Sequence, residues 1–138
     1  MFRPSIARVL RFEVPAGLGL SAQITARMTG GAEPWTVLAL GPSLHALVER
    51  EGEPGHPDTL YSTHFRAALD RLGQAYDWVI VDAPSVLGSG DANVVEEAAH
   101  GMIVAARSRV SRGADLRAAI RQLGDAKTVG VVLWDARP

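Results

Sequence analysis

The first group of residues that could do chemistry is a glycine-rich turn near the N-terminus, Pro15-Ala16-Gly17-Leu18-Gly19-Leu20-Ser21. It follows an apolar run and opens a helical pattern, so the backbone N–H groups of Gly17 and Gly19 can cradle an anion at a helix N-terminus. The hydroxyl of Ser21 can serve as a ligand of a magnesium ion. The alternative is a plain turn between a strand and a helix, with Ser21 as an ordinary first-turn residue.

The second group follows the apolar run Trp78-Val79-Ile80-Val81, which leads into Asp82, with Asp91 a short distance further on. Ligands of α/β folds bind at the carboxyl ends of parallel strands, and carboxylate oxygens suit Mg²⁺. Asp82 is therefore a candidate metal ligand, and Asp82 and Asp91 are candidate nucleotide-site residues. The alternatives are that Asp82 caps a turn and that Asp91 is the N-cap of the next helix.

Composition restricts the class of protein. The 138 residues, 47% hydrophobic and 21% charged, fit a single globular domain over residues 1–138. The chain has no cysteine, which excludes disulfides and thiolate metal sites, and its histidines lack the spacing of a zinc site. The net charge of −1 gives no reason to expect nucleic acid binding. No apolar run is long enough to span a bilayer, so we expect a cytoplasmic protein.

Five apolar runs predict strands, and the last four are nearly continuous in apolar residues, which is typical of strands buried on both faces. They cover residues 8–14, 35–40, 78–81, 102–106 and 129–134. Helical patterns alternate with them, over residues 20–28, 44–48, 61–72, 91–99 and 116–123. The alternation predicts an α/β fold, with a doubly wound, mainly parallel five-stranded sheet and helices on both faces.

Three stretches are similar to motifs of a known family. His56-Pro57-Asp58-Thr59-Leu60-Tyr61-Ser62 is similar to Asn-Pro-x-x-Leu-Leu-Ser, and Tyr76-Asp77-Trp78-Val79-Ile80-Val81-Asp82-Ala83-Pro84-Ser85 to Tyr-Asp-x-Ile-Ile-Ile-Asp-Thr-Pro-Pro. Gly130-Val131-Val132-Leu133 is similar to a Gly-Val-Val-Leu-Asn strand, and Asp91 matches an aspartate that follows the second motif. The chain thus resembles the bacterial tyrosine kinases of exopolysaccharide and capsule synthesis, which belong with the Min and Par ATPases to the deviant P-loop group. The resemblance implies a P-loop NTPase-like fold.

The chain departs from that family where catalysis would take place. Leu20 stands where the phosphate loop should end in a lysine, and the only lysine of the chain is Lys127. The second predicted strand runs into Gly41-Pro42-Ser43 instead of an acidic Asp-x-Asp, and Trp134 replaces the asparagine on the adenine side. Gly19-Leu20-Ser21 also resembles a Gly-Leu-Ser that opens a later helix of these kinases, and in that alignment the phosphate-loop half is absent altogether.

Together with these departures, the resemblance implies a non-catalytic P-loop ATPase-like or pseudokinase domain that acts as a protein-interaction or regulatory module in exopolysaccharide synthesis. We expect no cofactor. ATP and magnesium belong only to the alternative, a weak ATPase or tyrosine autokinase that takes its lysine from a partner. Tyr61 and Tyr76 lie inside predicted elements, which argues against them as phosphoacceptors. A Min/Par-like localisation adaptor is the third hypothesis. Expected partners are a second copy of the chain, an active paralogue or a membrane polysaccharide co-polymerase.

Overall fold

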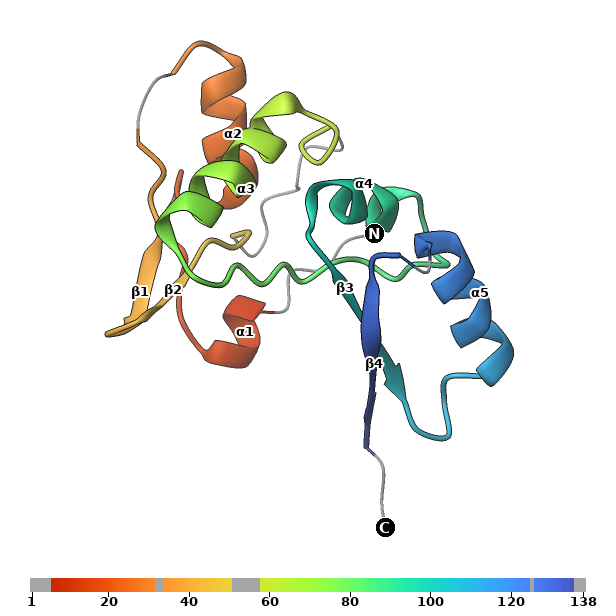
Figure 1. The fold of residues 1–138 in the computed structure, drawn as a ribbon. Helices are drawn as coiled ribbons and strands as arrows, with labels where there is room; N and C mark the ends of the chain where they lie inside the picture. The colour runs from red at the N-terminus through yellow and green to blue at the C-terminus, as the bar shows by residue number, and fades with distance from the viewer. Residues whose placement is uncertain (1–5, 32–33, 51–57, 125, 136–138) are drawn as a thin grey trace. The chain divides into compact units, whose positions relative to one another are not determined.

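The computed structural model describes residues 6–31, 34–50, 58–124 and 126–135 (Figure 1). Contacts divide the chain into two compact units, Met1–Val79 and Ile80–Pro138. Both units combine helices with strands, which confirms the α/β class. His56 and Pro57 of the first family-like motif lie outside the described residues.

The first unit is organised around two helices, α2 (Leu20–Met28) and α3 (Thr63–Ala75), preceded by the short helix α1 (Ile6–Leu10). α2 and α3 contact each other, and Ile24 of α2 is completely buried, as Phe65 and Ala68 of α3 nearly are. α3 begins at Ser62, whose hydroxyl oxygen accepts a hydrogen bond from the Phe65 N–H at 3.2 Å. The two predicted helices over residues 20–28 and 61–72 are therefore present.

The same unit contains an antiparallel hairpin of β1 (Leu38–Gly41) and β2 (Leu44–Ala46), with Ala39 opposite His45. The strand predicted over residues 35–40 is present in part, but the helix predicted over residues 44–48 is wrong. Pro42 and Ser43 favour a tight turn between two strands, and residues 44–46 pair their backbone groups with β1 across that turn.

Two further strand predictions are wrong, in both cases because the described part of the chain supplies no neighbouring strand. Residues 6–10 form α1, and residues 78–81 belong to no strand. A strand must pair its backbone N–H and C=O groups with a neighbour, whereas a helix pairs them internally. Over the described ranges no neighbouring strand is supplied to residues 8–14 or to residues 78–81. Trp78 and Ile80 consequently remain 87% and 93% exposed.

The second unit contains α4 (Asp91–Ala98), β3 (Met102–Arg107), α5 (Gly113–Leu123) and β4 (Thr128–Trp134) (Figure 1). β3 and β4 are parallel, with Val104 opposite Val131, so β3, α5 and β4 form a βαβ unit of the kind that the alternating pattern predicts. Its core consists of Ala92, Val104 and Leu123, against which further apolar side chains pack: Val86, Met102, Leu116 and Ile120.

The described residues thus form two sheets of two strands each, one antiparallel and one parallel, and not the predicted five-stranded sheet. The predicted strands over residues 102–106 and 129–134 and the helices over 91–99 and 116–123 are present. α5 stops before Gly124, whose φ of +76° lies in the left-handed region where a side chain is strained.

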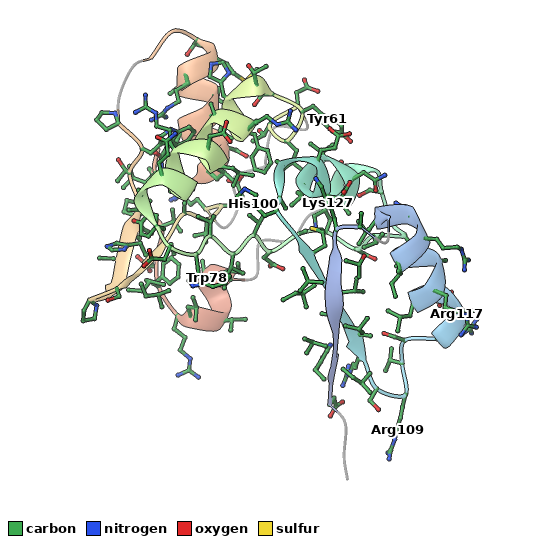
Figure 2. The ribbon with its side chains drawn as sticks, viewed as in Figure 1. Tyr61, Trp78, His100, Arg109, Arg117 and Lys127 are labelled. Atoms are coloured by element: carbon green, nitrogen blue, oxygen red, sulfur yellow. The ribbon has the colours of Figure 1, made fainter. Side chains whose placement is uncertain are left out.

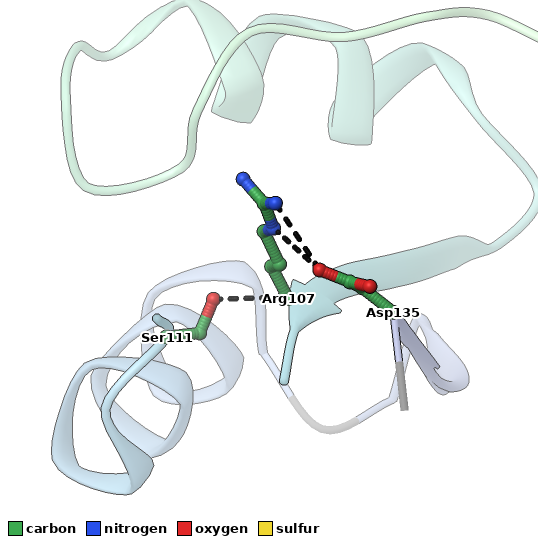
Figure 3. A network of polar contacts seen from close by, with 3 residues as sticks. All are labelled: Arg107, Ser111 and Asp135. Carbon is green, nitrogen blue, oxygen red and sulfur yellow. Dashed lines mark hydrogen bonds and ion pairs between the residues drawn. The ribbon is translucent and has the colours of Figure 1, made fainter. Parts of the chain in front are cut away.

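Side chains close the carboxyl end of the β3–β4 pair (Figure 3). The Nε and Nη2 atoms of Arg107 each donate to Oδ2 of Asp135 at 3.1 Å, and the Arg107 guanidinium lies 4.8 Å above the ring of Trp134. The hydroxyl of Ser111 accepts a hydrogen bond from the backbone N–H of Arg107 at 2.9 Å. The end of β3 is therefore held by the turn that follows it.

Candidate functional site

The glycine-rich turn does lead into a helix, as the sequence predicts. Gly17 has a φ of +79°, which a glycine adopts without strain, and Gly19 is the N-cap of α2. Gly19 has no side chain with which to cap the helix, so the first N–H groups of α2 must find partners elsewhere. The N–H of Leu20 donates to the carbonyl of Val48 at 3.1 Å. Gly17, Gly19 and Ser21 are thus brought together at one helix N-terminus.

The next backbone N–H at the start of α2, that of Ser21, donates a hydrogen bond to a carboxylate. The backbone N–H of Ser21 donates to Oε1 of Glu49 at 3.0 Å, and the hydroxyl of Ser21 donates to the same oxygen. Glu49 lies 28 residues after Ser21 in the chain, so this cap exists only through the tertiary fold. An anionic group at a helix N-terminus is stabilised by the helix dipole as well as by the hydrogen bonds. Glu49 occupies the kind of position that a bound phosphate would take.

The surroundings of this contact are buried. Ser21 and Thr59 are 7% and 5% exposed, and the Thr59 hydroxyl lies 3.4 Å from that of Ser21. The second carboxylate oxygen of Glu49, Oε2, is buried and has no hydrogen-bond partner among the described residues. Burial strengthens the pairing of Glu49 Oε1 with its two donors, because less water competes for them. Buried Ser21 and Thr59 and half-buried Glu49 therefore form a cluster that closes the turn.

Glycine at position 19 allows this closure. A Cβ added to Gly19 would lie 3.2 Å from the backbone nitrogen of Arg50 and 3.4 Å from Oε2 of Glu49. The first of these distances is tighter than ordinary van der Waals contact. Gly19 thus lets residues 48–50 approach the start of α2, instead of letting a phosphate approach it.

A buried glutamine fixes the other side of the turn. Gln23 is 5% exposed, and its side-chain amide donates to the carbonyls of Leu18 and Thr36, both at 2.9 Å. Its side-chain oxygen accepts from the N–H of Thr36 at 2.8 Å. All three bonds tie α2 to backbone on either side of it, so the turn is rigidly held in a shape that already satisfies its polar groups.

The two predicted carboxylates belong to the second unit. Asp82 is exposed and follows residues 78–81, which form no strand, so the strand end expected to present it is absent. Asp91 is the first residue of α4, and Gly90 precedes it as the N-cap. The alternative that Asp91 is itself the N-cap is therefore wrong by one residue. The hydroxyl of Ser89 donates to Oδ2 of Asp91 at 3.1 Å. Within the described ranges, no group of three His, Cys, Asp or Glu side chains could hold a metal ion.

The single lysine has a structural role in the second unit. Nζ of Lys127 donates to the carbonyls of Glu96 and Glu97 at 2.7 and 3.2 Å and lies 3.6 Å from Oε1 of Glu96. It therefore caps the last turn of α4, where a positive charge is favoured. Arg109 and Arg117 are exposed, on the turn after β3 and on α5 (Figure 2).

Sequence reasoning missed Glu49 and Thr59. The spacing along the chain does not connect either residue with Ser21, because the contacts span 28 and 38 residues. The only available signal was the lack of a side-chain cap at Gly19, which requires a partner from outside the helix.

Comparison with known proteins adds a fold likeness. No family model matches the sequence, and no curated protein matches it. The structure is similar to that of the chimerical protein CapA2B2, with a TM-score of 0.71 and 19% identity over 95% of this chain and 57% of that one. It is also similar to the BceF tyrosine kinase domain, with a TM-score of 0.61 and 24% identity over 83% of this chain and 48% of that one.

These identities are low enough that the likeness shows the fold alone, which this chain shares in part with the BceF tyrosine kinase domain. The chain spans about half the length of the solved structures it matches, 57% and 48%. Among the described residues, no helix combines the length and apolar character required to cross a membrane.

Proposed function

We propose that this chain is a degenerate P-loop ATPase-like domain, similar to a bacterial tyrosine kinase, that has lost phosphoryl transfer and acts as a protein-interaction or regulatory module. The observation that carries the proposal is the pairing of Glu49 with Ser21 at the start of α2. The donors that a phosphate would require are already bonded to the chain's own carboxylate.

Two effects oppose phosphate binding at this turn. A phosphate would have to displace Glu49 from two hydrogen bonds to a charged acceptor, each worth about 1.5–3 kcal/mol. The displaced carboxylate would remain nearby, and two anions at close range repel each other. The turn offers no compensation, because Leu20 stands in place of the phosphate-loop lysine and Lys127 caps α4.

The remaining parts of the proposal follow from the resemblance. A complete member would carry a five-stranded doubly wound sheet, of which this chain forms the β3–β4 pair. Its partner would be a second copy, an active paralogue or a membrane polysaccharide co-polymerase. The module would work in the cytoplasm, in exopolysaccharide synthesis, without a bound cofactor. A Min/Par-like localisation adaptor would use the same fold with a different partner.

One observation favours the catalytic alternative. Tyr61 lies in the turn before α3, not inside the helix, and is 60% exposed (Figure 2). The prediction that both tyrosines lie inside elements is therefore wrong, because Tyr76 is the C-cap after α3 and belongs to no strand. A partner kinase or an autokinase with a borrowed lysine could reach Tyr61. Tyr76 is half-buried, with its ring centroid 5.5 Å from that of His45.

Calorimetry with ATP and magnesium tests the proposal. We expect no saturable binding heat in the micromolar range for the full chain, and the same titration curve for the variant Asp82→Ala. Micromolar binding that Asp82→Ala abolishes, together with ATP turnover, would overturn the non-catalytic function.

Mass spectrometry after incubation with ATP provides the second readout. We expect no phosphate on Tyr61, whereas phosphotyrosine at that position would establish the autokinase alternative.

A further inference from the structure

Within the described part of the chain, strand β3 of the second unit is covered on one face only, whereas β4 is exposed on both faces along its second half. Along β3 the side chains alternate, with Val104 and Ala106 buried at 9% and 4% and Ile103 exposed at 64%. The register places the partners of the exposed β3 residues on the same side of β4. The open face consists of Ile103, Ala105, Arg107, Gly130, Val132 and Trp134. Parallel sheets are ordinarily covered on both faces, but the described residues leave this side of the pair open.

The sheet also has an open edge along β3. The N–H groups of Met102 and Ser108 donate toward β4, to the carbonyls of Lys127 and Trp134. Because N–H direction alternates along a strand, the N–H and C=O groups of Ile103 and Ala105 point to the opposite edge. No strand of the described part of the chain pairs there. The Ser111 hydroxyl closes this edge at Arg107, so the opening is a few residues long.

The same chain carries a segment that fits this opening. Residues 78–81, Trp78-Val79-Ile80-Val81, are 87%, 38%, 93% and 36% exposed, which is the alternation of an extended strand. Over the described ranges they pair with no strand. Aromatic and β-branched residues of this kind favour sheets. An unpaired apolar strand and an unpaired sheet edge are each a free-energy penalty that pairing would remove.

We propose that two copies of this chain associate by strand exchange, in which residues 78–81 of each copy add to the β3 edge of the other. This deepens the proposed interaction function and rests on it. The contact is reciprocal, so it closes into a two-fold dimer instead of a fibre. Strand addition supplies main-chain hydrogen bonds, and the apolar side chains beside the edge supply the preference for this segment.

Charge favours a second copy as the occupant. Asp77 and Asp82 flank the apolar segment, and Arg109 follows the closed end of the edge. An aspartate therefore approaches that arginine whichever direction the added strand runs. The net charge of −1 leaves little repulsion between identical chains.

Cross-linking tests the exchange directly, because the chain has no cysteine of its own. One preparation would carry Ile80→Cys and the other Ile103→Cys or Ala105→Cys, and the two would be mixed under mild oxidation. Adjacent strands bring Cα atoms within the range of a disulfide. We expect a covalent dimer from the mixture. Leu87→Cys is the matched control, since Leu87 is an exposed apolar residue of the same unit outside any strand, and it should give no such dimer.

The opposite outcomes are equally informative. If Ile80→Cys and Ile103→Cys in one chain form only a monomeric cross-link at every dilution, the segment pairs within its own chain and the exchange is wrong. Equal cross-linking by Leu87→Cys also overturns it, because the contact would then be non-specific. Neither result depends on nucleotide, so a failure here is distinguishable from ATP binding, which would overturn the proposed function itself.

Sedimentation of the unmodified chain and two variants gives an independent measurement. We expect a concentration-dependent dimer whose dissociation constant rises at least about tenfold in Ile80→Asp and is unchanged in Leu87→Asp. A dimer that is equally tight in Ile80→Asp, or a monomer at all concentrations in the unmodified chain, would show that residues 78–81 do not join copies.

Discussion

Oε1 of Glu49 accepts hydrogen bonds from both the backbone N–H and the hydroxyl of Ser21, across 28 residues of sequence. Residues far apart in the chain thus perform the capping that a local serine or aspartate performs in most helices. We therefore expect this contact, which joins buried Ser21 to half-buried Glu49, to matter for the folding of the first unit.

Replacing Glu49 should destabilise the first unit in a graded way. Glu49→Ala removes the cap and should cost about 1–2 kcal/mol. Glu49→Gln keeps an acceptor but loses the charge at the helix N-terminus, so it should cost about 0.3–1 kcal/mol. Urea unfolding, followed together with hydrogen exchange of the Ser21 amide, measures both. Glu13→Ala, at an exposed glutamate of the same unit, is the control and should change little.

Two glycines should respond to alanine with opposite signs. Gly19→Ala forces a methyl group to 3.2 Å from the backbone nitrogen of Arg50 and should destabilise by about 1–3 kcal/mol. Gly73 lies within α3 with nothing inside 4 Å of the added Cβ, so Gly73→Ala should stabilise by about 0.5–1 kcal/mol. Thermal unfolding of the two variants decides the point. A neutral Gly19→Ala would mean that residues 48–50 do not approach the turn closely.

Gln23 should be intolerant of an apolar residue of similar size. Gln23→Met retains volume but leaves two carbonyls and one N–H without their partner, and unsatisfied buried polar groups cost about 1–3 kcal/mol each. Gln74→Met, at an exposed position of α3, provides the comparison. Equal unfolding midpoints in urea for the two variants would contradict the bonding of Gln23.

Lys127 should stabilise the second unit without any part in phosphate binding. Lys127→Met removes the donor to two carbonyls at the end of α4 and should cost about 1 kcal/mol. Faster hydrogen exchange in the last turn of α4 would report the loss locally. Arg117→Met removes an exposed positive charge from α5 and should leave that exchange unchanged.

The core of the second unit should depend on Val104. Val104→Ala removes buried methyl groups beside Ala92 and Leu123 and should cost about 2 kcal/mol. Val129 is 74% exposed, so Val129→Ala should cost far less. Denaturant titration of both variants tests this, and a similar loss in the two would place the core elsewhere.

The helices α2, α3, α4 and α5, and the strands that belong to one βαβ unit, could be predicted from the sequence, whereas α1 could not. The spacing of Leu116, Ile120 and Leu123 specifies a helix face, and Gly124 ends that helix in a left-handed conformation. These features depend on neighbours within one or two turns. The apolar runs over residues 102–106 and 129–134 pair with each other across a single connecting helix. The glycine-rich turn also begins a helix where its pattern predicts.

Only the tertiary structure decided what fills that turn and which apolar runs become strands. The sequence by itself determined the absence of a lysine beside Gly19 and Ser21, but it did not determine that Glu49 takes up the donors of Ser21. The run over residues 78–81 has the composition of a buried strand and still remains unpaired. The physical reason is the same in both cases: a helix completes its own hydrogen bonds, whereas a cap or a strand depends on a partner brought from elsewhere in the fold.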